Sequence, residues 1–270
     1  MRQLSINEIQ EYLLALMREL DAFLVKNEVP YYMLGGSALG AVRHEGFIPW
    51  DDDIDIGMHR ADYERFISIA EPFSEKYKVV NFHNSDICDY CLSRIYIPNT
   101  YVDNAANKYN SLDKRLYLDI FPIDNVPDNN NELALYEKRI VKRKKLIAFI
   151  DTKDYGGSGV KLCAKKALSA ALRPQRNRIL ARTDSLMKKY SNVKTTRVCS
   201  LSSQYSFEKQ VMMRDVYGTP KRHRFCDTEF FVPENTDAYL TTLFGADYMQ
   251  IPCEGKRRKG CDVYLLNEDD

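Results

Sequence analysis

Four aspartates fall within residues 51–55, the acidic segment, and their spacing suits a divalent cation. Asp53 and Asp55 are separated by one isoleucine, so a β-strand would place both carboxylates on one face of a sheet. Two neighbouring carboxylates repel each other unless a cation lies between them. Carboxylate oxygens are the ligands that Mg²⁺ prefers, with Mn²⁺ as an alternative. Asp51 falls in the same run and is a further candidate ligand.

A glycine-rich turn precedes the acidic segment and suits a phosphate group. Gly35, Gly36 and Ser37 offer unhindered backbone N–H groups and a hydroxyl, which are donors that phosphate oxygens accept. A metal site beside such a cradle predicts phosphoryl or nucleotidyl transfer.

Two arginines and one tryptophan are further candidates for substrate binding. Arg43 and Arg94 are candidate phosphate ligands, and the alternative for each is an ordinary salt bridge. Trp50 directly precedes the acidic segment and is a candidate wall of the pocket or a ring that stacks on a base.

A third acid stands alone in an apolar stretch. Asp119 is flanked by Leu118 and Ile120, and an acid in such a strand is costly unless it meets a cation or a hydrogen-bonding partner. If its strand lies next to that of Asp53 and Asp55, the three carboxylates form one site. Asp119 would then act as a metal ligand or as the base for an attacking hydroxyl, and both roles stay open.

The elements that position these residues follow from periodicity, caps and turn residues. Helices are predicted at 5–26, 37–42 with Ser37 as the cap, 61–73, 132–150, 160–172, 175–190 and 236–244. Strands are predicted at 31–34, 54–58, 78–82, 91–97 and 116–121. This order predicts an α+β (mixed α/β) fold in which helices flank a small mixed sheet and a helical insertion follows.

We expect three segments that form one compact unit: a catalytic core with an N-terminal helix at 1–130, a basic helical region at 131–195, and a C-terminal α/β segment at 196–270 that packs back on the core. The formal net charge is only +1, yet residues 138–182 carry fourteen Lys and Arg against two Asp. This stretch is either a solvated helix face or a peripheral contact with anionic lipid. It lacks an RNA-binding module, so no nucleic acid partner is expected.

The seven cysteines are odd in number and irregular in spacing, which indicates free thiols rather than a disulfide framework. The pair Cys88 and Cys91 has the spacing of a zinc or redox motif, but no second pair completes four zinc ligands, so buried thiols are the default. The N-terminus lacks a signal peptide, and no run of about 18 apolar residues is present. We expect a cytoplasmic protein, with peripheral association at the inner face of the membrane as the open alternative.

Several longer motifs together resemble the LicD family. The longest runs from Ala41 to Gly57 and continues from Arg60 to Phe66. Segments at Arg94–Thr100, Tyr117–Pro127 and Val232–Met249 resemble further motifs of the family, so the likeness spans about residues 30 to 260. LicD proteins are phosphocholine transferases within the nucleotidyltransferase superfamily related to DNA polymerase β, and fukutin and fukutin-related protein are distant relatives.

The resemblance implies a donor and an acceptor. The donor would be CDP-choline or a related CDP-alcohol, and the acceptor a sugar hydroxyl of a cell-surface glycan, such as lipopolysaccharide or teichoic acid, or of its lipid-linked precursor, with release of CMP. Asp53 and Asp55 would be the metal-binding pair, and Asp119 the third carboxylate.

One departure concerns the C-terminus. The family tends to carry a histidine near Lys256–Cys261, whereas no histidine follows His223 here, which leaves the donor or acceptor open. The alternative activity is transfer of NMP from an NTP to a small molecule, a protein or an RNA end.

Overall fold

In the computed structural model, which describes residues 1–81, 84, 91–103, 113–257 and 260–266, a mixed sheet of seven strands lies at the centre. Its main path runs β2–β3–β7–β5–β4, while β8 pairs with β7 and β9 pairs with β8. The strands are β2 (Tyr32–Met33), β3 (Asp55–His59), β4 (Lys78–Val80), β5 (Ser93–Tyr96), β7 (Tyr117–Val126), β8 (Arg197–Cys199) and β9 (Val211–Met213). Among these described strands, only β3 and β7 pair in parallel. The predicted fold class is confirmed.

The long strand β7 holds the sheet together. Leu118, Ile120 and Ile123 are fully buried in the main core, because a central strand is covered on both faces. The register places Asp119 of β7 opposite Asp55 of β3 on one side. The sequence-based expectation that Asp119 lies on a strand next to that of Asp55 is therefore confirmed.

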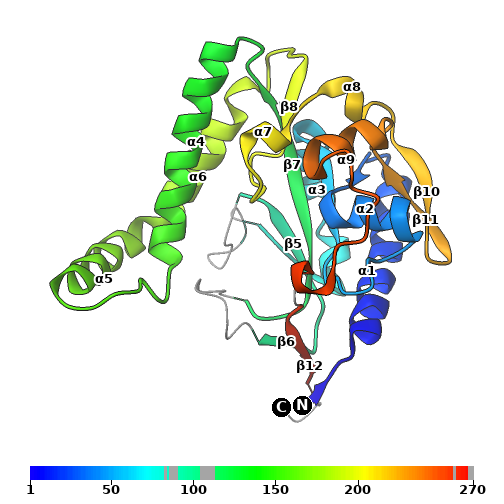
Figure 1. Cartoon of the computed structure of the whole chain (residues 1–270), viewed down its shortest axis with the longest axis horizontal. Helices are drawn as coiled ribbons and strands as arrows, with labels where there is room; N and C mark the ends of the chain where they lie inside the picture. Colours follow the sequence, from blue (N-terminus) through cyan, green and yellow to red (C-terminus); the bar gives the residue numbers. More distant parts are fainter. Residues whose placement is uncertain (82–83, 85–90, 104–112, 258–259, 267–270) are drawn as a thin grey trace.

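Helices flank the sheet, as Figure 1 shows. They include α1 (Ile6–Lys26), α2 (Gly35–His44), α3 (Arg60–Ile69), α7 (Phe207–Gln210), α8 (Arg214–Tyr217) and α9 (Thr236–Phe244). Helix α1 begins with a capping box between Ser5 and Glu8 and buries its leucine stripe in the main core. The prediction that Ser37 caps α2 was wrong, because the helix begins two residues earlier, after Leu34.

Smaller strands complete the fold. β1 (Arg2–Gln3), β12 (Asp262–Leu265) and β6 (Thr100–Asp103) form a three-stranded antiparallel sheet, and β10 (Lys221–Phe225) and β11 (Thr228–Val232) form a hairpin. The first sheet joins residues from both ends of the chain.

Three helices form the basic region that the sequence predicted. They are α4 (Asn130–Asp151), α5 (Val160–Leu172) and α6 (Arg176–Met187). Helices α4 and α6 share a second core with the end of β7, built around Val126, Tyr136 and Leu180. In contrast, α5 extends away from the sheet (Figure 1). Within the described residues, no helix has both the length and the apolar character needed to cross a membrane.

Candidate active site

The first turn of α2 lies directly against the acidic segment. A Cβ atom added to Gly36 would lie 2.6 Å from Oδ2 of Asp51, and one added to Gly35 would lie 3.4 Å from Oδ2 of Asp55. Gly35 also has a φ of +50°, a conformation that favours glycine. Its N–H donates to the hydroxyl of Tyr239 at 2.9 Å. The two glycines therefore let carboxylates approach the positive end of a helix.

Ser37 positions the start of β3. Its Oγ accepts the backbone N–H of Asp55 at 2.9 Å, which joins α2 to the strand. The strand begins only at Asp55, so the expectation that Asp53 lies on the same strand was wrong. Side chains alternate along a strand, and a strand that continued back through Asp52 would place that carboxylate on the buried face of Ile54. The chain leaves the sheet instead.

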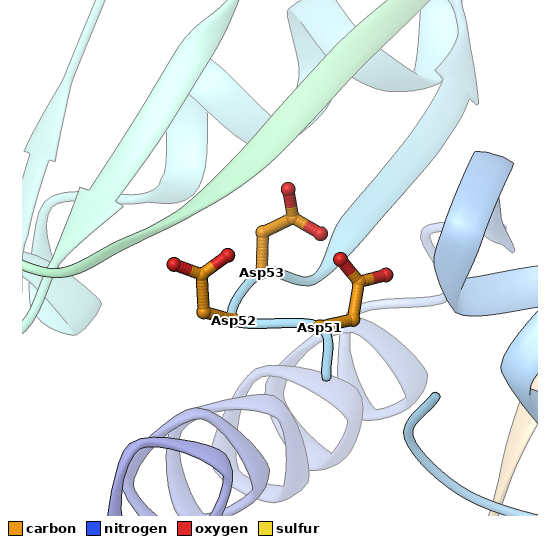
Figure 2. A group of neighbouring side chains, drawn as sticks. All are labelled: Asp51, Asp52 and Asp53. Carbon is orange, nitrogen blue, oxygen red and sulfur yellow. The ribbon is translucent and has the colours of Figure 1, made fainter. Parts of the chain in front are cut away.

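Asp51, Asp52 and Asp53 form a cluster just before β3. Their candidate ligand atoms all lie within 4.8 Å of one another, and the three residues are partly buried. Figure 2 shows the three carboxylates on the segment that leads into the strand. A set of carboxylate oxygens fits a hard divalent cation such as Mg²⁺. The sequence-based prediction did not include Asp52, although the unbroken acidic run was a signal that pointed to it.

Asp119 is held by Arg94 from the neighbouring strand β5. The two residues lie in register, and Nε of Arg94 donates to Oδ1 of Asp119 at 2.8 Å. The guanidinium also lies 4.2 Å from the ring centre of Tyr117. Burial raises the pKa of Asp119, and the charge of Arg94 opposes that rise. The structure thus supplies the salt bridge weighed for Arg94, while its contact with phosphate stays a prediction.

The C-terminal segment covers the acidic segment. Arg43 donates from Nη1 to the carbonyl oxygens of Tyr248 at 2.8 Å and Gln250 at 3.2 Å. The guanidinium of Arg257 lies 4.4 Å from the ring centre of Trp50. These contacts anchor the segment, and the phosphate role of Arg43 and the substrate role of Trp50 stay predictions.

Asp52 makes a further contact with the same segment. Its Oδ2 accepts the backbone N–H of Cys261 at 2.6 Å. Residues 258–259 of this basic stretch lie outside the described residues. This hydrogen bond holds the carboxylate of Asp52 against the C-terminal segment.

A buried network of ion pairs links α3, β7 and α6, and the sequence analysis did not predict it. Arg60 donates to both carboxylate oxygens of Asp124, at 2.7 and 2.8 Å, and to Asp184 at 3.2 Å. Lys188 also pairs with Asp184, at 2.8 Å. Because these residues come from α3, β7, α6 and the turn that follows α6, the network fixes the basic helices to the catalytic sheet. The available signal was the position of Arg60 and Asp124 within the motifs quoted above.

The zinc alternative is not tested, because Cys88 lies outside the described residues. Its partner Cys91 is buried, and its thiol donates to the carbonyl of Leu180 at 3.7 Å. The other described cysteines are free thiols.

The mixed sheet, with acids near the start of its parallel strands and a glycine-serine helix start beside them, is consistent with a nucleotidyltransferase-like fold. Residues 28–149 match the LicD/FKTN/FKRP nucleotidyltransferase domain.

Relatives support the same class. The chain is 25% identical over 263 residues to the lipopolysaccharide cholinephosphotransferase LicD of Haemophilus influenzae, which covers 94% of this chain and 95% of that protein. The ribitol 5-phosphate transferase FKRP of Homo sapiens is 53% identical over 34 residues, or 13% of this chain and 7% of that protein. An uncharacterized protein of Rickettsia prowazekii is 32% identical over 115 residues, 42% of this chain and 40% of that protein. The match to the cholinephosphotransferase along nearly the whole chain supports a phosphotransferase activity.

Proposed function

We propose that this protein transfers phosphocholine, or a similar phospho-alcohol, from a CDP-alcohol to a sugar hydroxyl of a cell-surface glycan or its lipid-linked precursor. The observation that carries the proposal is the approach of Asp51 and Asp55 to the Gly35-Gly36 start of α2. That arrangement combines a cation site with a helix N-terminus, and a diphosphate needs both. The nearly full-length match to a cholinephosphotransferase supports the choice of phospho-alcohol.

The residues proposed to hold Mg²⁺, or Mn²⁺ as the alternative, are Asp51, Asp53, Asp55 and Asp119, and the cluster adds Asp52. The ion, when bound, would offset negative charge on the diphosphate as the bond to CMP breaks. Backbone N–H groups of the first turn of α2 that follow Gly35 would bind phosphate oxygens, because the first N–H groups of a helix lack partners within it, whereas that of Gly35 donates to Tyr239.

The bond changes are simple. The acceptor oxygen forms a bond to the phosphorus that carries the alcohol, and the bond from that phosphorus to the CMP oxygen breaks. The hydroxyl proton passes to a base, and CMP leaves with the electron pair. Asp119 is proposed as that base or as a metal ligand, while Arg94 holds its carboxylate in place.

The first test is ligand-dependent stability. Thermal unfolding is measured with Mg²⁺ and, in turn, CDP-choline, CDP-ethanolamine, CDP-glycerol, CDP-ribitol, CTP and ATP. A ligand at 100 times its dissociation constant adds about 2.7 kcal/mol of stability. We expect a Mg²⁺-dependent rise in Tm with one CDP-alcohol. Asp53→Asn should lose that rise, whereas Asp215→Asn, at an exposed residue of α8, should keep it.

The identity of the leaving product separates the proposed reaction from nucleotidyl transfer. Incubation with the CDP-alcohol that binds and a glycan acceptor should release CMP. Release of pyrophosphate from CTP or ATP, with no response to any CDP-alcohol, would replace the proposal with nucleotidyl transfer on the same carboxylates.

A further inference from the structure

One apolar face of helix α5 points away from the protein, while the half-buried Leu162 and Leu172 lie toward the packed side of the helix. At 100° per residue, Val160, Ala164, Ala167, Leu168 and Ala171 share one side of the helix. All five are exposed, Val160 at 87% and Leu168 at 55%. An amphipathic helix normally buries such a face against its own protein, so this orientation needs an explanation.

The opposite side of α5 is the one that packs on the protein. Ser169 is the buried residue of this helix, and its hydroxyl donates to the carbonyl of Ile150 in α4 at 3.2 Å. We refer to residues 152–173, the connection from α4 together with α5 and its last turn, as the arm. In Figure 1 the arm lies at the far side of α4 from the sheet.

Exposed lysines lie around the rest of α5. Lys161 borders the apolar face, Lys165 lies further round on the same side, and Lys166 lies on the polar side near Ser169. A lysine beside an apolar surface can extend along it and keep its ammonium group at the polar edge. An apolar face with lysines on the polar side is typical of helices that lie in a membrane interface.

A basic groove opens beside Lys166. It has a volume of about 350 Å³ and is lined by Thr152, Lys153, Tyr155, Lys166, Ser169, Ala170 and Arg173. Within the described part of the chain, Lys153, Lys166 and Arg173 make no ion pair. Of the nearby acids, Asp151 is bound by Arg176 through both oxygens, and Asp154 accepts the N–H of Gly156 within the connection. The groove therefore keeps an excess of positive charge.

We propose that the arm docks on an anionic lipid surface, with the outer face of α5 in the interface and the cations on its polar side, those of the groove among them, toward the headgroup phosphates. The charge decides between the candidate occupants. A second copy of the chain would bring two sets of lysines together, and like charges repel, whereas an anionic surface neutralises them. This inference does not rest on the proposed reaction, and each can fail alone.

Vesicle sedimentation of the full chain tests the charge. We expect binding to vesicles of phosphatidylcholine mixed with phosphatidylglycerol, weak binding to phosphatidylcholine alone, and loss of binding as salt rises. Removing Lys161, Lys165 and Lys166 together by substitution with Gln should weaken binding about 100-fold, or about fivefold per cation. The matched control substitutes the exposed Lys26, Lys194 and Lys209 with Gln and should change binding less than about threefold.

A second pair of variants tests the apolar face. Val160→Gln with Leu168→Gln should weaken vesicle binding at least about tenfold, because two exposed apolar side chains leave the interface. Val25→Gln with Val193→Gln alters two other exposed apolar residues, each 49% exposed, and should bind as the wild type does. Both changes are at exposed positions, and unchanged thermal unfolding verifies that the variants fold.

Three results would overturn the inference. The first is equal binding to neutral and anionic vesicles, or wild-type binding by the α5 variants. The second is a dimer in sedimentation velocity, without lipid, that Val160→Gln with Leu168→Gln abolishes, since the face would then belong to a second copy. The third is that soluble glycerol phosphate fully displaces the protein from vesicles and that Lys153→Gln with Arg173→Gln abolishes this displacement. The groove would then be assigned to a free phosphate ester.

Discussion

The catalytic sheet and the arm hold their cations in opposite ways. Arg60, with a side chain only 7% exposed, has two carboxylate partners at hydrogen-bonding distance in the interior. Lys166 of the arm is exposed, lines an open groove and has no ion-pair partner among the described residues. A buried charge must be paired within the fold, whereas an exposed charge is stabilised by water until an external partner binds. The buried cation is therefore neutralised within the fold, whereas the cations of the arm stay available to an external anion.

The largest effect is expected at the acid that faces α2. Asp55→Asn should lower kcat/KM for CMP release about 10³-fold, because it removes a proposed metal ligand without changing side-chain volume. Stability should hold, since the change removes charge repulsion between neighbouring carboxylates. Steady-state kinetics and urea unfolding measure the two effects, with Asp215→Asn as the control. Full activity after the Asp55→Asn substitution would remove Asp55 from the site.

Breaking the buried network should cost the most stability. Arg60→Met leaves Asp124 buried without its partner, and we expect a loss of about 3–5 kcal/mol in urea unfolding. Arg18→Met breaks the exposed pair with Asp227 and should cost no more than about 1 kcal/mol. Equal losses in the two variants would contradict the contrast between buried and exposed charges.

The pH dependence of stability tests the interior further. Burial, with a smaller contribution from Arg214, lowers the pKa of His59 from 6.5 to about 4. Its ring packs 5.8 Å from the ring centres of both Tyr32 and Tyr217. As pH falls below about 6.5, the unfolded chain binds the proton first, so stability is lost progressively down to about pH 4.

The expected loss from this histidine is up to about 3 kcal/mol, at about 1.4 kcal/mol per unit of pKa. This loss is measured by urea unfolding of the wild type and of His59→Gln at about pH 7, 5.5 and 4, which span the range between the two pKa values. The variant should lose less stability than the wild type over this range. Parallel pH profiles would show that His59 is not the group responsible.

The close approach of Gly36 to the carboxylate of Asp51 leads us to expect a smaller and more specific effect. Gly36→Ala should displace the carboxylate of Asp51 and lower activity about 10- to 100-fold, because small misplacements at a reacting centre are costly. Stability should change by less than about 1 kcal/mol, since the end of a side chain can move. Gly255→Ala, where an added Cβ meets nothing within 4 Å, should keep full activity.

The smallest effects are expected in the arm. Lys165→Gln with Lys166→Gln should change the free energy of unfolding by less than about 0.5 kcal/mol, because both side chains are exposed. Ser169→Ala removes the buried hydrogen bond to α4 and should cost about 1 kcal/mol. A loss above about 0.5 kcal/mol in the lysine variant would mean that these two lysines make stabilising interactions within the fold.

Local patterns made much of the fold predictable. Leucine periodicity placed α1 within a residue of its bounds, because a helix repeats its buried face every 3.6 residues. The predicted bounds of α5 agree with the structure as well. The apolar neighbours of Asp119 placed β7, although its length was underestimated. The start of α2 was misjudged, because Ser37 directs its hydroxyl to Asp55 rather than to its own helix.

The sequence by itself determined the chemistry that is available: an acidic segment, a glycine-serine turn, a lone acid in a strand and a basic helical stretch. Only the tertiary structure decided their partners. It set Asp119 against both Asp55 and Arg94, added Asp52 to the cluster, buried Arg60 between two acids, and turned the apolar side of α5 outward. Residue types and short-range spacing specify local structure, but pairing across a sheet and the choice of a packed face depend on residues far apart in the chain.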